Sequence, residues 1–178
     1  MRLLTSLFVF ALLLLSTCSA DSDTSSESTT KDTTETVIYF SRHAEKAGGE
    51  NPGLLPEGKE RADRLAARLR GENIAAVYAT GFRRTQETAA PTVTAAGVAL
   101  KKYGFSANPE RTTKRWAKKH RGETILVVGH SNTVPGLVNA LVPGARLTDI
   151  SENDYDNLYK VTIPVNGEPR MERLSSAE

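Results

Sequence analysis

Hydrophobic and polar positions follow two patterns over residues 36–174, and each pattern predicts one kind of element. Short runs of β-branched and aromatic residues, bounded by Gly, Pro or Asn, are typical of strands. Longer stretches with apolar residues three and four apart are typical of amphipathic helices. The predicted strands are 36–41, 74–78, 100–103, 124–128, 158–164 and 171–174. The predicted helices are 56–70, 82–96, 109–120 and 132–141, with Pro91 kinking or interrupting the second.

The order of these elements predicts the fold class. Strands separated by helical segments favour an α/β sheet with helices on both faces. Residues 124–128 form the most apolar run, which is typical of the centre of a parallel sheet. The last two strands are expected to form a hairpin across Asn166-Gly167. We therefore expect a three-layer α/β/α sandwich with a mostly parallel central sheet.

The first twenty residues have the pattern of a signal peptide. Nine consecutive apolar residues, 7–15, follow a positively charged start. They are too few to span a bilayer, which takes about 20 residues. Two processing routes remain open. Cys18-Ser19-Ala20 offers an ordinary signal peptidase site, and residues 15–18 resemble a bacterial lipobox, in which the signal ends before Cys18. The first predicts a periplasmic or secreted protein and the second a membrane-anchored lipoprotein.

The next segment is expected to be a tether. Residues 21–36 hold ten Ser/Thr, five Asp/Glu and one Lys, with no apolar residue. Such a segment cannot bury enough surface to offset the entropy of ordering it. The predicted domains are therefore a signal peptide over 1–20, a disordered tether over 21–35 and one folded domain over 36–178.

Composition narrows the function classes. The net charge is +2, with 23 basic residues dispersed among 21 acidic ones, so dedicated nucleic-acid binding is not expected. A single cysteine excludes an intrachain disulfide framework and a multi-cysteine metal site. Three histidines make a large histidine-based metal cluster improbable, and we predict neither a metal nor a cofactor. Membrane contact is expected only through a lipid on Cys18.

Two of the histidines follow directly after predicted strands. His43 comes after the first strand and His130 after the most apolar one. Ligands bind at the carboxyl ends of strands in open α/β sheets, so the two imidazoles can face one pocket if their strands are neighbours. Gly129 permits close backbone approach, and Ser131-Asn132 is expected to cap the next helix and offer N–H groups to an anion. The third histidine, His120, lies in a basic run and is expected at the surface.

The residues around these histidines suit phosphate chemistry. Arg42 carries a permanent positive charge in a fork that matches phosphate oxygens. A neutral imidazole is a nucleophile toward phosphorus, and the charge of Arg42 favours the neutral form of His43. A second arginine, Arg83 or Arg84, would neutralise the oxygens of the transferring group. This combination predicts a phosphoryl-transfer site that needs no metal.

Three motifs carry a resemblance to a known family. Residues 42–45, Arg-His-Ala-Glu, resemble the Arg-His-Gly-Glu signature of the histidine phosphatase (phosphoglycerate mutase-like) superfamily. Residues 83–89 resemble the segment with the second arginine of that family, with Arg84 at the matching position, and Gly129-His130-Ser131 resembles the segment with its second histidine. The resemblance implies a phosphoglycerate mutase-like fold, phosphorylation of His43, and a phosphate pocket of Arg42, Arg84 and His130.

Two departures from the family pattern affect the prediction. Ala44 replaces the usual glycine, a small change that is expected to be tolerated. The acidic proton donor that some members carry has no clear counterpart. The weak candidates are Glu45, Glu110, Asp154 and Asp156. Without a donor, a phosphoramidate or an ester with a good leaving group would be favoured.

The leading hypothesis is a histidine acid phosphatase-type phosphohydrolase. It would act without metal on a small phosphate monoester or phosphoramidate, through a phosphohistidine on His43, with Glu45, Ser131 and Asn132 in contact with the substrate. One alternative is a catalytically weak module of the cell envelope that binds a phosphorylated ligand. Another is a transferase that passes the phosphoryl group to a sugar hydroxyl.

Overall fold

The computed structural model describes residues 34–176. The predictions made for residues 1–33, including the signal peptide, most of the tether and Cys18, lie outside the described residues. Within 34–176 no helix is both long and apolar enough to cross a membrane.

A six-stranded sheet forms the centre of the fold, in the order β3-β2-β4-β1-β5-β6. Strands β3, β2, β4 and β1 run parallel, whereas β5 is antiparallel to β1 and β6 is antiparallel to β5. The sheet is therefore mostly parallel, as predicted, with an antiparallel hairpin at one edge. The strands are β1 (Thr36–Arg42), β2 (Ile74–Ala79), β3 (Leu100–Lys102), β4 (Thr124–Gly129), β5 (Leu158–Ile163) and β6 (Arg170–Leu174).

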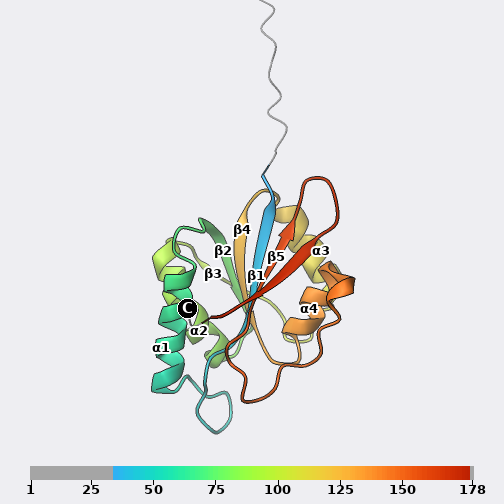
Figure 1. Ribbon diagram of the computed structural model, residues 1–178. Coiled ribbons are helices and arrows are strands. Elements are labelled where there is room, and N and C mark those ends of the chain that lie inside the picture. Colours follow the sequence, from blue (N-terminus) through green and yellow to red (C-terminus); the bar gives the residue numbers. More distant parts are fainter. Residues whose placement is uncertain (1–33, 177–178) are drawn as a thin grey trace, which may run out of the picture. The chain divides into compact units, whose positions relative to one another are not determined.

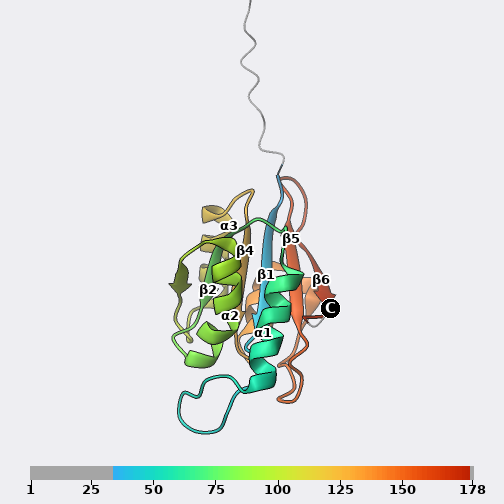
Figure 2. The ribbon, with the colours of Figure 1, turned by 90° about the vertical axis from the view of Figure 1, so that its left-hand side faces the viewer.

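Four helices cover the two faces of this sheet, which confirms the three layers. Helices α1 and α2 lie on one face, and α3 and α4 lie on the other (Figures 1 and 2). The helices are α1 (Pro56–Arg68), α2 (Arg83–Ala96), α3 (Pro109–Lys119) and α4 (Val134–Leu141), with a short 3-10 turn, η1 (Pro143–Ala145), after α4.

Each face of the sheet has its own hydrophobic core, and the sequence periodicity explains both. On the α1 side, Leu65 and Leu69, four residues apart, pack against Val77 and Leu126 of the sheet. On the α3 side, Trp116 is 1% exposed and packs in the second core. Strand β4 lies between β2 and β1, and its residues 125–128 are all fully buried. The most apolar run is therefore the central strand.

Two local expectations differ from the structure. Pro91 does not interrupt helix α2, because the buried positions on both sides of the proline, such as Ala89 and Thr92, are held by packing. Packing outweighs the one helical hydrogen bond that proline cannot donate. Helix α4 begins at Val134 with Thr133 as its N-cap residue, so Ser131-Asn132 does not cap it. The hydroxyl of Ser131 instead donates to Glu152.

Candidate active site

The two predicted histidines meet because their strands are direct neighbours. Strands β1 and β4 pair in parallel with Arg42 opposite Gly129, and the amide N of His43 donates to the carbonyl of Gly129 at 2.9 Å. The two imidazole rings are edge to face, with centroids 5.4 Å apart, and both residues are 3% exposed. The parallel register thus brings residues 87 positions apart in the sequence to one edge of the sheet.

Gly129 occupies a position where a side chain does not fit. A Cβ atom there would lie 2.9 Å from both the hydroxyl of Tyr103 and a methyl group of Val134. The absence of a side chain lets the first turn of α4 and the end of β3 close over the end of β4. The expected close backbone approach at Gly129 is confirmed.

The ring of His43 presents an unprotonated nitrogen. Its Nδ1 lies 2.8 Å from the carbonyl oxygen of Ala44, and because a carbonyl only accepts, the neutral ring carries its proton on Nδ1. Within residues 34–176, Nε2 has no hydrogen-bond partner. Burial, opposed by the hydrogen bond to the Ala44 carbonyl and helped by the positive charges of Arg42 and Arg84, lowers the pKa of His43 to about 4. The ring is therefore neutral at pH 7, with a free lone pair on Nε2.

A chain of hydroxyl groups fixes the second ring. Nη2 of Arg84 lies 3.3 Å from Nδ1 of His130, and Nε2 of His130 lies 2.8 Å from the hydroxyl of Thr80. The Thr80 hydroxyl is 2.9 Å from that of Thr85, which in turn donates to the carbonyl of Phe82 at 2.8 Å. Since a guanidinium only donates, Nδ1 accepts and Nε2 carries the proton. Burial, and then the charge of Arg84, lowers the pKa of His130 to about 3.

Two arginines, the buried Arg42 and the partly buried Arg84, lie beside these rings, and each has one unpaired N–H group. Nη1 of Arg42 donates to the carbonyls of Ser151 and Asp154, at 2.7 and 2.9 Å. Nε of Arg42 and Nε of Arg84 are buried without a hydrogen-bond partner. Buried donors are nearly always paired, so such groups need an explanation. An anion bound between the arginines would supply the missing acceptors.

His43, Arg84 and His130 line an open cleft of about 590 Å³ at the carboxyl ends of the parallel strands, whereas Arg42 is buried behind that lining. This volume is within the range usual for small-molecule sites. Its lining residues come from the segments that follow β1, β3 and β4, from the first turn of α2 and from the segment before β5. They are His43, Lys46, Arg84, Phe105, His130, Ser131, Asn132, Asp149, Ile150, Ser151 and Glu152.

The four carboxylates weighed from the sequence lie outside this lining. Glu45 forms a two-pronged ion pair with Arg61, with contacts of 2.8 to 3.0 Å. Glu110 is on α3, where it pairs with Lys114. The side chain of Asp154 pairs with Arg173, and that of Asp156 accepts from the serines at 175 and 176. Of the residues predicted to contact substrate, the structure brings Ser131 and Asn132 into the cleft and keeps Glu45 with Arg61.

Two other carboxylates, Asp149 and Glu152, do line the cleft, and sequence reasoning missed them. Both precede β5, and because β5 is antiparallel to β1 its first residue lies at the same edge as the carboxyl end of β1. The predicted hairpin of the last two strands was the available signal. It shows that one of the two strands must run against the parallel ones, but not which.

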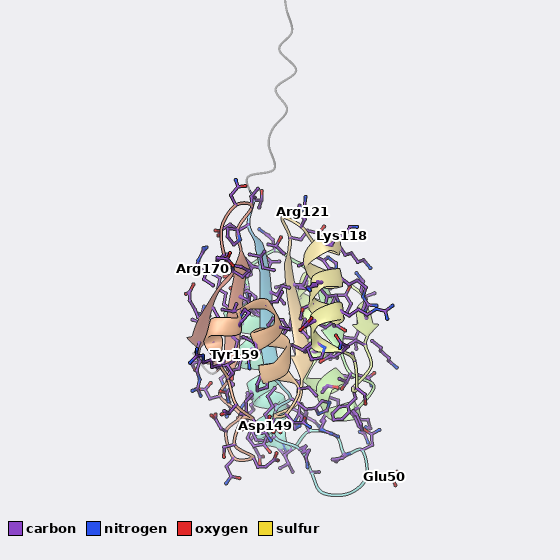
Figure 3. The ribbon with its side chains drawn as sticks, turned by 90° about the vertical axis from the view of Figure 1, so that its right-hand side faces the viewer. Glu50, Lys118, Arg121, Asp149, Tyr159 and Arg170 are labelled. Atoms are coloured by element: carbon purple, nitrogen blue, oxygen red, sulfur yellow. The ribbon has the colours of Figure 1, made fainter. Side chains whose placement is uncertain are left out.

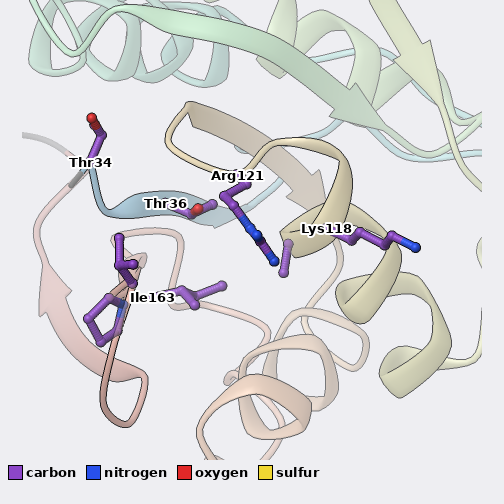
Figure 4. A pocket seen from close by; sticks show the side chains of 8 residues that line it. Thr34, Thr36, Lys118, Arg121 and Ile163 are labelled. Atoms are coloured by element: carbon purple, nitrogen blue, oxygen red, sulfur yellow. The ribbon is translucent and has the colours of Figure 1, made fainter. Parts of the chain in front are cut away.

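A second pocket, of about 560 Å³, lies near the opposite ends of the strands. Figure 3 shows two of its residues, Lys118 and Arg121, far from Asp149 of the cleft, and Figure 4 shows the pocket itself. It is lined by Thr34, Thr36, Ala117, Lys118, Arg121, Ile163, Pro164 and Val165. It has no histidine and no carboxylate, so its lining offers no nucleophile or general base like those in the cleft.

No metal-binding group is evident in the cleft. Within residues 34–176, no three His, Cys, Asp or Glu side chains cluster in a way that could hold a metal ion. At the end of the parallel sheet, two neutral imidazoles and Arg84 line the cleft, and Arg42 lies buried next to its lining residue Ser151. This is the composition of a site for a phosphate-sized anion next to a nucleophile.

Comparison with known families agrees with that class of site. The model of the histidine phosphatase superfamily (branch 1) matches residues 38–103, which include Arg42, His43 and Arg84. The matched segment holds two of the three motifs that resemble the histidine phosphatase superfamily, and the fold is the one that solved histidine phosphatases have. The family resemblance noted in the sequence is thereby confirmed. No curated protein matches the chain.

Solved structures of low sequence identity share the fold. The putative phosphohistidine phosphatase SixA from Agrobacterium tumefaciens is 17% identical, with a TM-score of 0.58 over 78% of this chain and 96% of that one. A protein histidine phosphatase SixA complexed with tungstate is 18% identical, with a TM-score of 0.62 over 79% and 97%. A phosphoserine phosphatase from Entamoeba histolytica in complex with 3-phosphoglyceric acid is 13% identical, with a TM-score of 0.58 over 80% and 100%.

Proposed function

We propose that this protein is a phosphatase that hydrolyses small phosphate monoesters or phosphoramidates through a phosphohistidine on His43. The observation that carries the proposal is the unpaired Nε2 of His43 beside two arginines with unpaired Nε groups. The nucleophile and the two guanidinium groups that would bind the phosphoryl oxygens thus lie together at one end of the sheet. The match to the superfamily model and the phosphatase names of the structural neighbours support the same activity.

The first step transfers the phosphoryl group to the enzyme. Nε2 of His43 attacks phosphorus, and an N–P bond forms as the bond from phosphorus to the leaving atom breaks. Arg42 and Arg84 hold the phosphoryl oxygens, and their charges offset the negative charge of the transition state. The dianionic substrate favours protonation of the nearby His130 ring, which then also donates to these oxygens.

The second step returns the enzyme to its starting state. Water attacks the phosphorus of phospho-His43, the N–P bond breaks, and its electron pair returns to Nε2. The neutral state of His43 matters here, because a protonated ring has no lone pair to attack with. With a pKa of about 4, His43 stays neutral in mildly acidic solution, which supports a phosphatase of the acid type. Ser131 and Asn132 are proposed to contact the substrate from the rim of the cleft.

The test uses the full chain with a metal chelator present throughout. We expect p-nitrophenyl phosphate to be hydrolysed between pH 4 and 8 and His43→Ala to abolish turnover. Rapid quenching into alkali followed by mass spectrometry should locate a phosphoryl group on His43. Unchanged turnover in His43→Ala would contradict the mechanism. Phosphate binding without turnover in the parent protein would favour the alternative, a module that binds a phosphorylated ligand.

We further propose that the enzyme acts outside the cytoplasm. The support is the charged start and apolar run of residues 1–15, followed by Cys18 at a cleavage site. Expression of the full chain in bacteria, with fractionation and metabolic labelling by a fatty acid, tests this. Label that disappears in Cys18→Ser indicates the lipoprotein route, and unlabelled protein in the periplasm indicates simple secretion. Unprocessed protein in the cytoplasm contradicts export.

A further inference from the structure

The carboxylate of Glu152 lies at the mouth of the cleft. It accepts hydrogen bonds from two donors that a bound phosphoryl group would also use. Oε2 of Glu152 lies 3.2 Å from Nη2 of Arg42, and its Oε1 accepts from the hydroxyl of Ser131 at 3.0 Å. The side chain of Glu152 is 77% exposed, whereas that of Arg42 is 1% exposed. An exposed carboxylate therefore contacts a buried cation.

The backbone that carries Glu152 is fixed on both sides. Nη1 of Arg42 donates to the carbonyls of Ser151 and Asp154, and the amide of Ile150 donates to the carbonyl of Ser131 at 3.0 Å. The amide of Asp154 also donates to the carbonyl of Ser151, which closes a tight turn. Only the side chain of Glu152 needs to move when a ligand enters.

The direction of the reaction makes this position useful. In an in-line displacement by Nε2 of His43, the leaving group departs on the side of phosphorus away from His43. His43 is buried at the base of the cleft, so the leaving atom points toward the mouth. Glu152 lines the cleft with a side chain that is 77% exposed, which places it on the solvent side of a phosphoryl group held at His43.

We infer that Glu152 is the proton donor to the leaving group and then the base that activates water. This rests on the proposed phosphatase function. A phosphoryl group that takes the Arg42 and Ser131 donors displaces the carboxyl group of Glu152 toward the leaving atom. Once displaced from Arg42, the carboxylate takes up a proton from solvent. In the first step this Glu152 O–H proton passes to the leaving oxygen or nitrogen, which keeps the electron pair of the broken bond. In the second step the Glu152 carboxylate takes a proton from the attacking water and is restored.

The other carboxylate of the cleft is a poorer candidate. Asp149 lines the cleft and is exposed, but within residues 34–176 it makes no hydrogen bond or ion pair. Nothing couples it to the groups that would hold phosphate. Glu152 alone among the cleft carboxylates touches both Arg42 and Ser131.

Leaving groups that differ in their need for a proton test the assignment. p-Nitrophenolate leaves without a proton, whereas the alkoxide of glycerol phosphate needs one. In Glu152→Gln we expect kcat for glycerol phosphate to fall about 100-fold or more and that for p-nitrophenyl phosphate by less than about threefold. Glu50→Gln, an exposed glutamate in the loop after β1, makes the same charge change and should leave both rates unaltered.

Three results would count against the assignment in different ways. Equal losses for both substrates in Glu152→Gln would show that Glu152 acts only by charge or structure and is not the donor. The substrate-selective loss appearing in Asp149→Asn instead would assign the proton to Asp149. A parent protein that hydrolyses neither substrate would overturn the phosphatase function itself, and with it the role of Glu152. Glu152→Asp, which keeps the acid, should recover part of the glycerol phosphate activity.

Discussion

Two buried histidines in this protein differ in whether Nε2 of the ring has a hydrogen-bond partner. His43 and His120 are 3% and 4% exposed, and both carry their ring proton on Nδ1. In His120, Nδ1 lies 2.6 Å from a carboxylate oxygen of Glu123, and Nε2 lies 2.9 Å from the hydroxyl of Tyr78. In His43, Nδ1 donates to a carbonyl and Nε2 has no partner within residues 34–176. Both ring nitrogens of His120 have hydrogen-bond partners, whereas Nε2 of His43 keeps a free lone pair.

This difference separates a structural site from a candidate catalytic one. Tyr78, whose hydroxyl caps Nε2 of His120, packs against Trp116 with ring centroids 5.0 Å apart, in the core of the α3 face. In the described part of the chain no side chain forms a hydrogen bond with Nε2 of His43, and Arg42 and Arg84 lie close to the ring. A saturated ring contributes its hydrogen bonds to stability. An imidazole ring with an unpaired Nε2, placed beside two cations, is able to attack an anion that those cations bind.

The largest expected effect comes from replacing each of the two histidines in turn. His43→Ala should lower kcat by a factor on the order of 10⁴ or more, because it removes the nucleophile. His120→Ala should leave kcat within about twofold and lower the free energy of unfolding by about 1–3 kcal/mol, because it strands the hydroxyl of Tyr78. Steady-state kinetics and urea unfolding of both variants provide the measurement. A catalytic loss in His120→Ala would show that the two sites are coupled.

The next effect tests the geometry of the arginine beside His130. Arg84→Lys keeps the charge but loses the planar fork and its buried Nε, so we expect kcat/KM to fall about 100-fold. Arg83→Lys is the matched control, since the side chain of Arg83 is 64% exposed and pairs with Glu87. It should change kcat/KM by less than about threefold. Equal losses in the two variants would remove Arg84 from the phosphate pocket.

A smaller effect is expected from the hydroxyl chain behind His130. Thr80→Val removes the partner of Nε2, so kcat should fall about tenfold while KM changes little. Thr92→Val is the matched control, because the buried hydroxyl of Thr92 has no hydrogen-bond partner. Nitrogen chemical shifts of His130 report its tautomer, and Thr80→Ser should restore both the shift and the rate. An unchanged tautomer in Thr80→Val would show that Thr80 does not fix the ring.

The smallest expected effect is a dependence of stability on pH. Burial lowers the folded-state pKa of His43 to about 4, below the ordinary histidine value of about 6.5. Between these values the unfolded chain binds more protons than the folded one, so the free energy of unfolding decreases as pH falls from 6.5 to 4. Titration by NMR gives the pKa, and urea unfolding at pH 7 and 5 gives the stability change. The decrease should be smaller in His43→Ala, and a His43 pKa near 6.5 would contradict the prediction.

Much of the fold was predictable because local pattern and global packing agree. The predicted strands and helices are present with small shifts at their ends, since their apolar periodicity matches the two cores. His43 and His130 could be placed together because each follows a buried strand of a parallel sheet. The family motifs then singled out Arg84 over its neighbour Arg83, and the structure places Arg84 against His130.

His120 shows where sequence reasoning failed. It was expected at the surface because its neighbours are basic, but it is 4% exposed. It ends α3 one turn after Trp116, and that turn directs it inward against Tyr78 of β2. The partner that makes burial acceptable is 42 residues away in the sequence, so no local pattern reveals it.

The sequence by itself determined the elements, the parallel core and the two histidines at the ends of its central strands. These depend on periodicity and on the rule that strand ends share an edge of the sheet. Only the tertiary structure decided that β5 runs against β1 and so carries Glu152 to the cleft. Only the tertiary structure showed that Thr80 is the hydrogen-bond partner of Nε2 of His130, and that Tyr78 is the partner of Nε2 of His120. Such pairings depend on strand direction and on contacts between distant residues, which local pattern does not specify.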